Sequence, residues 1–202
     1  DSPYLAAGQY RSYKGNAGKS KVTIGRLKRN LGNKSHVGLI ATNRDYHVGG
    51  SGSVVEFDSL INFLDDYILD LNYARSDTQE GNINFIDTND TFAGRTYAMD
   101  GESFSGVAKN FRLRWAVDKA NAGVRFSDVS PTYRAHVGFV GRNDYQYRNY
   151  WYGRTYRSQG TIRKINFNLN NRNRLNSKNE KILEFYEFQI DLETDFNFTG
   201  AI

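Results

Sequence analysis

The chain of 202 residues contains no cysteine, only two prolines and one methionine, and no long apolar run. The lack of cysteine excludes disulfide scaffolds, thiolate metal sites and cysteine nucleophiles. No segment approaches the roughly 18 consecutive apolar residues of a membrane-spanning helix, so helical spanning is excluded as well. Spanning by β-strands is not excluded, because a tilted barrel strand needs only about 9 to 11 residues of alternating character.

A concentrated basic segment is also lacking. The 27 lysines and arginines are scattered beside 22 acidic residues, and the formal net charge is +5. Because no basic block is present, we expect no nucleic-acid partner. The first residues, 1–4, have neither the basic nor the apolar region of a secretory signal. We therefore expect a mature chain or an internal fragment.

Aromatic residues make up 14% of the chain although the mean hydropathy is -0.67, so apolar and polar residues are finely interleaved. Their alternation has a period of two, which places one set on each face of a β-strand. In the clearest example, Val55 and Phe57 alternate with Glu56 and Asp58. The pattern predicts clear strands at 53–64, 67–75, 103–117, 122–126 and 186–198, and weaker ones at 21–29, 36–44, 134–140, 145–157 and 161–175.

Turn signals separate these segments. Asp65-Asp66 and Asp118-Lys119 predict tight connections, glycine and asparagine cluster between other strands, and one long polar loop covers about 76–100. The last strand, about 15 residues long, exceeds the roughly 5 to 6 residues of a typical globular strand. Aromatic residues near strand ends are typical of the girdles of membrane barrels. They are Tyr67, Tyr73, Trp115, Tyr145, Tyr147, Trp151 and Tyr186.

These features favour an all-β, antiparallel, up-and-down transmembrane β-barrel, present as a fragment of about ten strands and forming a single unit over 1–202. Alternation alone does not distinguish a barrel from a soluble β-sandwich, whose apolar faces meet in a core about 10 Å thick. The sandwich stays open as the alternative fold.

Two segments, 24–45 and 126–145, resemble the C-terminal barrel region of the DUF5916 outer-membrane proteins of Bacteroidetes and related Gram-negative bacteria. The second is the more specific, because its Asp-Val-Ser-Pro at 128–131, its Gly-Phe-Val at 138–140 and its Arg-x-Asp at 142–144 follow the order and spacing of the family. Gly141 stands where the family usually has proline. The N-terminal domain of the family, which is similar to family 9 carbohydrate-binding modules, has no counterpart here.

The resemblance implies an address in the bacterial outer membrane and an internal or C-terminal barrel fragment. It also marks a set of motif residues, for which we expect a structural role at the bend after the proline. These residues are Asp128, Pro131, Arg134, Gly138, Arg142 and Asp144.

Paired carboxylates are the most suggestive chemical feature, because two acids across a cleft can serve glycoside hydrolysis. Acids compensated by arginines in a polar barrel lumen explain them better, so we expect no catalysis in this region. We expect contacts to a ligand at the lumen or rim instead. The candidates are Glu56, Asp58, Asp70, Arg112, Arg114, Tyr150, Trp151, Glu187 and Asp191.

No cofactor or metal is expected. The three histidines, His36, His47 and His136, lack the spacing of metal ligands, and 87–90 lacks the glycine and terminal glutamate of a calcium loop. The sequence thus predicts a non-catalytic outer-membrane barrel that binds or admits a polar solute such as an oligosaccharide. Its expected partners are the lipid bilayer and other chains or missing strands that complete the wall. The alternative is a soluble carbohydrate-binding sandwich or an accessory domain of a glycoside hydrolase.

Overall fold

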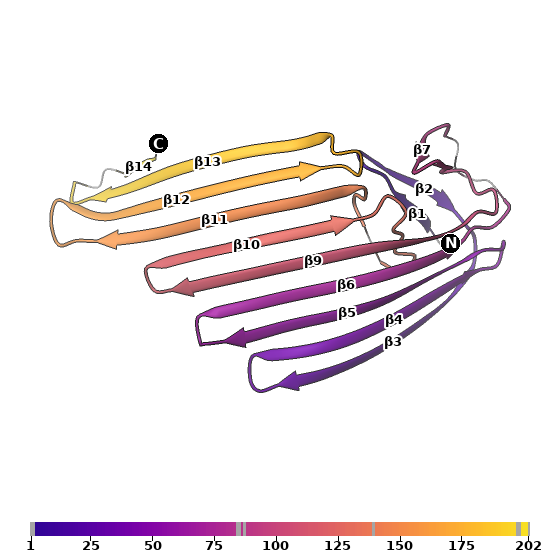
Figure 1. Ribbon diagram of the computed structural model, residues 1–202, viewed down its shortest axis with the longest axis horizontal. Coiled ribbons are helices and arrows are strands. Elements are labelled where there is room, and N and C mark those ends of the chain that lie inside the picture. Colours follow the sequence, from indigo (N-terminus) through magenta and orange to yellow (C-terminus); the bar gives the residue numbers. More distant parts are fainter. Residues whose placement is uncertain (1–2, 84–85, 87, 139, 197–198, 202) are drawn as a thin grey trace.

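Antiparallel strands dominate the computed structural model, which describes residues 3–83, 86, 88–138, 140–196 and 199–201. Ten strands within these residues form one large sheet (Figure 1). They are β3 (Ser20–Leu31), β4 (Ser35–Tyr46), β5 (Ser51–Phe63), β6 (Tyr67–Gln79), β9 (Ser103–Val117), β10 (Ala120–Val129), β11 (Tyr145–Arg157), β12 (Ile162–Leu175), β13 (Lys181–Thr194) and β14 (Thr199–Ala201). Two small sheets pair β1 (Pro3–Ala7) with β2 (Ser12–Asn16) and β7 (Thr91–Phe92) with β8 (Arg95–Thr96).

The large sheet is an up-and-down meander, with the order β14-β13-β12-β11-β10-β9-β6-β5-β4-β3 and antiparallel pairing throughout. Both predicted tight connections are confirmed. Residues 64–66 join β5 to β6, and Leu64 and Asp65 have φ angles of 47° and 57°, the left-handed backbone that a tight hairpin favours. Asp118-Lys119 joins β9 to β10. The prediction of an all-β, antiparallel fold is therefore confirmed for the described residues, and nine of the ten predicted strands correspond to strands of the large sheet.

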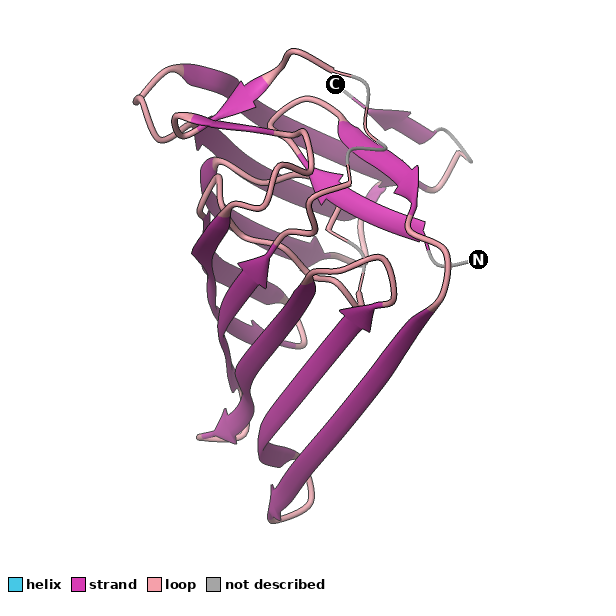
Figure 2. Ribbon diagram, turned by 90° about the vertical axis from the view of Figure 1, so that its right-hand side faces the viewer, coloured by secondary structure: helices cyan, strands magenta, loops and turns pink. Residues whose placement is uncertain are grey.

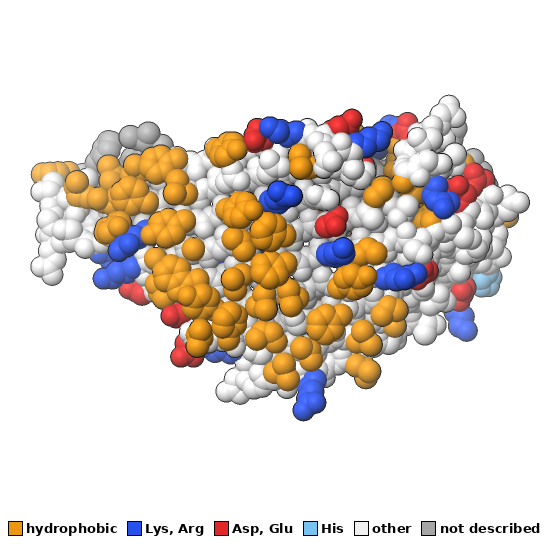
Figure 3. Space-filling model, in the orientation of Figure 1, with side chains coloured by type: hydrophobic (Ala, Val, Ile, Leu, Met, Phe, Trp, Pro, Cys, Tyr) orange, Lys and Arg blue, Asp and Glu red, His pale blue; other side chains and the backbone are white. Residues whose placement is uncertain are grey.

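The register keeps apolar residues on one face of the sheet from strand to strand. Phe57 lies opposite Leu39 on one side and Tyr73 on the other, and Leu113 lies between Leu69 and Val124. Further along, Leu169 lies between Tyr152 and Phe188. Figure 3 shows hydrophobic side chains spread over this face, which we call the apolar face.

The opposite face, here called the polar face, carries the residues that alternate with these. Glu56, Asp70, Arg112 and Arg125 lie on it, as do Asn166, Asn168 and Asn170 of β12. Figure 2 shows the strands curving around the side on which the small sheets and long loops gather.

Three segments fold together at one end of the polar face and are called the cap: the described residues of 3–18, 80–102 and 130–144. One buried cluster in the cap centres on Tyr4, Phe92 and Met99, and it contacts Tyr46 of β4 and Phe104 of β9. A second cluster packs Tyr133 against Val54, Ala74 and Val129 of the sheet. The apolar core of the molecule therefore sits between the cap and one end of the sheet.

The weak strand predicted at 134–140 is wrong. The described residues of this segment form turns in the cap, while Phe139 lies outside the described residues. The alternation there has another cause. Arg134 and His136 point into the cap, where both are buried, and the segment crosses the polar face so closely that a Cβ on Gly106 would lie 2.3 Å from the Tyr133 Cα.

The boundaries of two other elements also differ from the prediction. Strand β6 runs on to Gln79, so the long loop begins at Glu80 instead of residue 76. The reason is that residues 76–79 continue the pairing with both β5 and β9. Strand β13 ends at Thr194 and is followed by a turn, so the predicted strand at 186–198 starts and ends too late; Phe198 lies outside the described residues. Strands β1 and β2 were not predicted.

The large sheet is open over the described residues. Strand β3 pairs only with β4, and β14 pairs only with β13, through three residue pairs. A closed barrel is therefore not formed by this part of the chain. No second sheet packs across the apolar face in the described residues, so a β-sandwich does not describe this fold. Among the same residues, no helix has the length and apolar character to cross a membrane.

Candidate functional site

Three of the predicted ligand contacts meet in a hollow of about 340 Å³ on the polar face, beside the cap. Glu56 of β5, Asp70 of β6 and Arg112 of β9 line it, together with Arg125 of β10. Arg112 donates to the Asp70 carboxylate at 2.8 Å across the ladder, since the two residues are register partners. The hollow therefore offers one bound ion pair, one further arginine and a carboxylate to a polar ligand.

Asp58 lies next to this hollow, on the β4 side of β5. Its carboxylate is 3.3 Å from His36 Nε2 and 3.5 Å from Arg26 Nη2. It also covers Gly38, where a Cβ would lie 2.5 Å from the Asp58 Oδ1. Asp58 thus contacts two basic side chains of the neighbouring strands on the polar face, Arg26 of β3 and His36 of β4.

The predicted acids of β13 are on the polar face but far from those of β5. Asn170 donates to Glu187 at 3.3 Å, and Gln189 donates to Asp191 at 2.7 Å. Five strands separate β13 from β5 in the sheet. Arg114 lies on the same face, exposed, and opposite Gly123. The structure therefore does not gather all the predicted charges into one site.

Tyr150 and Trp151 were predicted as a pair of ligand contacts, and the structure separates them. Trp151 lies on the polar face over Gly123, where a Cβ would be 2.1 Å from the Trp151 Cζ2. Tyr150 lies on the apolar face, with its ring centroid 5.8 Å from that of Phe126. Adjacent residues of a strand point to opposite faces, so only Trp151 can contact a ligand on the polar face.

Two residues predicted for an aromatic girdle also lie on the polar face. The rings of Tyr145 and Tyr147 lie under the guanidinium of Arg174, at 5.3 and 5.4 Å from their centroids. In contrast, Tyr67 and Trp115 are register partners on the apolar face, close to the hairpin ends of β6 and β9. Proximity to a strand end alone does not tell which face an aromatic residue takes.

Arg134, from the motif that resembles the DUF5916 proteins, is the most deeply buried charged residue of the cap at 2% exposed. Its Nη1 donates to the carbonyl oxygens of Ala7, Pro131 and Tyr133, at 3.3, 3.1 and 3.0 Å. Burial lowers the pKa of its guanidinium, and stacking on aromatic rings offsets part of the cost. Those rings belong to Phe92, Tyr97 and Phe104.

The other motif residues are spread out. Asp144 accepts a hydrogen bond from the backbone nitrogen of Ser177, Arg142 is exposed, and Asp128 lies on the apolar-face side of β10 opposite Lys109. Pro131 opens the turn that follows β10, and Gly138 N donates to the Ala135 carbonyl at 3.2 Å. These residues position the 130–144 segment and form no common charged cluster.

His136 joins the cap to two strands of the sheet. Its Nδ1 lies 3.2 Å from the Tyr46 hydroxyl and its Nε2 lies 3.0 Å from Thr78 Oγ1, while its carbonyl accepts from Arg44. Burial and the nearby arginines, Arg134 and Arg44, lower the pKa of His136 to about 4. The ring is therefore neutral at neutral pH.

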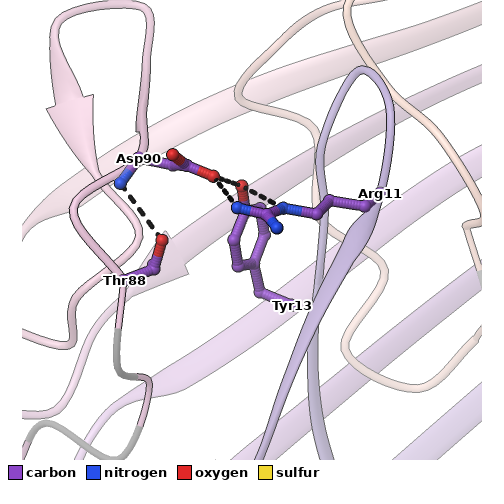
Figure 4. Close-up of polar contacts among 4 residues, drawn as sticks. All are labelled: Arg11, Tyr13, Thr88 and Asp90. Atoms are coloured by element: carbon purple, nitrogen blue, oxygen red, sulfur yellow. Dashed lines mark hydrogen bonds and ion pairs between the residues drawn. The ribbon is translucent and has the colours of Figure 1, made fainter.

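A second hollow, of about 750 Å³, opens on the outer side of the cap. Arg11 and the Tyr13 hydroxyl both donate to the Asp90 carboxylate, and Asp90 N donates to Thr88 Oγ1 at 3.1 Å (Figure 4). Tyr13 stacks on Tyr97, with ring centroids 4.0 Å apart. Sequence reasoning missed this hollow because its residues come from four separated segments, and only the oxygen-rich stretch around Asp90 had drawn notice.

Comparisons of the chain with protein-family models, with curated proteins and with solved structures found no match. The assignment to the DUF5916 proteins thus stays a prediction from the sequence resemblance.

Proposed function

We propose that this chain forms part of the wall of an outer-membrane β-barrel, with its apolar face against lipid and its polar face lining the lumen. A single observation carries the proposal: the register of the sheet places large apolar side chains from every long strand on one uncovered face. Leu27 is 73% exposed, Leu169 48% and Phe188 58%. These residues lie in β3, β12 and β13, so the apolar surface extends across the sheet.

Such a surface is unfavourable in water, because exposed apolar area costs about 25 cal/mol per Å² relative to burial. Monomeric soluble proteins rarely expose contiguous apolar patches above a few hundred Å². A hydrocarbon environment removes this cost, while the polar face remains hydrated in a lumen. Strand length agrees with this arrangement: the nine long strands have 10 to 15 residues, enough to cross a bilayer when tilted.

The lumen side supports contact with a polar solute such as an oligosaccharide. The hollow lined by Glu56, Asp70 and Arg112 offers carboxylate and guanidinium groups, and Trp151 adds an aromatic surface on the same face. Hydroxyl-rich ligands bind through such groups, with a few placed polar side chains fixing orientation. We propose binding or passage of the solute without catalysis.

The membrane part of the proposal is tested by sedimentation of the purified chain with and without detergent. We expect a monodisperse particle that carries bound detergent, and aggregation when detergent is removed. A monodisperse particle in plain buffer would contradict the proposal.

The solute part is tested by titrating a set of neutral and acidic oligosaccharides into the protein in lipid nanodiscs, using calorimetry. We expect Arg112→Gln to weaken binding by about tenfold or more, because a hydrogen bond to a charged group contributes about 1.5 to 3 kcal/mol. Arg148→Gln, on the apolar-face side of β11, is the matched control and should bind as the wild type does. Binding to none of the sugars, or equal binding by both variants, would contradict the solute proposal and leave the membrane proposal standing.

A further inference from the structure

Three carboxylates meet where β6 ends and β9 begins. Glu80 directly follows β6, Glu102 directly precedes β9, and Glu80 N donates to the Glu102 carbonyl at 2.9 Å, which extends the ladder between the two strands. Asp100 reaches the same place from the loop. One oxygen from each of the three side chains lies within 4.8 Å of the other two.

Two oxygens of this group are buried without a hydrogen-bond donor. Glu80 is 6% exposed, and its Oε2 has no hydrogen-bond partner. Glu102 Oε2 is also buried without a hydrogen-bond partner. Within the described residues, these three acids form one ion pair. It joins Arg95 Nη1 to Glu102 Oε1 at 3.3 Å. A buried carboxylate oxygen without a donor or cation is costly, so the cluster is suited to a ligand that carries positive charge.

The electrostatics agree with the geometry. Burial, together with the neighbouring Asp100 and Glu102 carboxylates, raises the pKa of Glu80 to about 7. The Arg134 guanidinium and a backbone hydrogen bond from Asp100 to the Glu80 carboxylate act in the other direction but do not cancel the effect. The Glu80 carboxylate is therefore stabilised at this position by binding either a proton or a cation.

The chemistry of the donors selects the type of cation. All three ligands are carboxylate oxygens, which favour a hard ion, and neither histidine nor cysteine is among them. Oxygens that bind Ca²⁺ lie about 2.3 to 2.6 Å from it, so two of them on one ion are at most about 5 Å apart. The observed limit of 4.8 Å fits that span.

We propose that Glu80, Asp100 and Glu102 bind one Ca²⁺ ion, with water completing the coordination. Glu80 and Glu102 belong to the ends of two adjacent strands, whereas Asp100 belongs to the cap segment that carries Phe92 and Tyr97. The ion fastens this segment of the cap to the large sheet. The site is separate from the hollow proposed for the solute, so either proposal can fail alone.

The test is calorimetry of the detergent-solubilised chain with CaCl₂ at a pH of about 8, where Glu80 with its pKa of about 7 is ionised. We expect one ion per chain with a dissociation constant of about 10⁻³ M or tighter, the range of extracellular calcium modules. Glu80→Gln should weaken binding by at least about tenfold, because it removes one of three charged ligands. Glu187→Gln, a carboxylate on β13 outside the cluster, is the matched control and should bind Ca²⁺ as the wild type does.

Asp100→Asn provides a second test if Glu80→Gln does not fold, because Asp100 is exposed and its loss leaves the core unchanged. Terbium luminescence excited through tyrosine gives an independent readout, and Ca²⁺ should displace Tb³⁺ from the wild type. No saturable Ca²⁺ binding up to about 10 mM, well above the expected range, would overturn the proposal. Equal binding by the wild type and both cluster variants would overturn it as well.

Discussion

Two buried polar residues, Arg134 and His136, organise the cap. Arg134 Nη1 and both ring nitrogens of His136 have partners from segments far apart in the sequence, such as Ala7 for Arg134 and Thr78 for His136, whereas Arg134 Nη2 is buried without one. Buried polar groups stabilise a structure only when such partners are in place, so both side chains report on the integrity of the cap.

His136 makes the cap sensitive to acid. Its folded pKa of about 4 lies below the ordinary value of 6.5, so the folded state binds fewer protons than the unfolded state between these values. The contribution of His136 to the free energy of unfolding is therefore constant above a pH of about 6.5 and falls by about 3 kcal/mol as the pH drops to about 4. Arg44 and Arg134 add to the effect, because each disfavours a second positive charge beside it. Glu80 contributes in the opposite direction over the same range, because its pKa is raised from 4.5 to about 7 and the folded state therefore binds its proton more tightly.

The measurement is hydrogen exchange of cap amides as a function of pH, corrected for the intrinsic exchange rate. Because the Glu80 contribution is common to all variants, each variant is compared with the wild type. The change in the free energy of protection between pH values of about 4 and 7 should differ from that of the wild type by about 3 kcal/mol in His136→Gln, while His47→Gln, whose side chain is exposed, should match the wild type. The same pH dependence in the wild type and in His136→Gln would refute this account of His136.

Arg134 provides a second prediction at this scale. Arg134→Lys should destabilise the cap by roughly 2 to 3 kcal/mol, because a lysine lacks the planar fork that reaches several carbonyl oxygens while stacked on Phe92. Limited proteolysis of the cap should become correspondingly faster. The control is Arg142→Lys, an exposed residue of the same motif, and an equal effect in both variants would show that burial of Arg134 is irrelevant.

At the scale of single strands, β12 offers a matched pair of adjacent positions. Leu169 lies on the apolar face and Asn168 on the polar face. In lipid, an arginine near the middle of the bilayer costs about 2 to 4 kcal/mol, whereas an exposed substitution in water changes stability by about 0.5 kcal/mol or less. We expect Leu169→Arg to reduce the free energy of unfolding in vesicles by the larger amount and Asn168→Arg by the smaller.

Urea titrations of both variants in vesicles measure the difference. Nearly equal effects at the two positions would mean that the two faces of β12 meet the same solvent.

The elements themselves show what the sequence could predict. Alternation located β5, β9 and β11 closely, because each of these strands has two faces in different surroundings. It failed at 134–140, where residues alternate between a cap interior and its surface without forming a strand. It also missed β1 and β2, which are five residues long and carry small or polar residues that give no periodic signal.

The candidate site was predictable to a similar extent. The alternation of apolar and polar residues placed Glu56, Asp70 and Arg112 on the polar face correctly. Assigning a residue to a face in this way needs only its neighbours along the same strand. The same alternation places the adjacent residues Tyr150 and Trp151 on opposite faces of β11. The grouping of Glu80 with Glu102 was beyond prediction, because it depends on the register between β6 and β9 across a loop of unknown path.

At the scale of the whole molecule, the proposal places requirements on both edges of the sheet. Strand β3 has an unpaired side within the described residues, and β14 covers only the Asp191–Glu193 part of β13. Unpaired backbone groups do not persist in hydrocarbon, so a membrane wall needs further strands at these edges. We expect other strands, from the same or another chain, to supply them.

The chain carries a probe on each face that tests the central claim directly. It has two tryptophans, of which Trp115 lies on the apolar face opposite Tyr67, and Trp151 lies on the polar face over Gly123. Single-tryptophan proteins made by Trp151→Phe and Trp115→Phe are placed in vesicles whose lipids are brominated on the acyl chain near the headgroup. The account predicts strong quenching of Trp115 and little quenching of Trp151. Equal quenching of both, or quenching of neither, would contradict it.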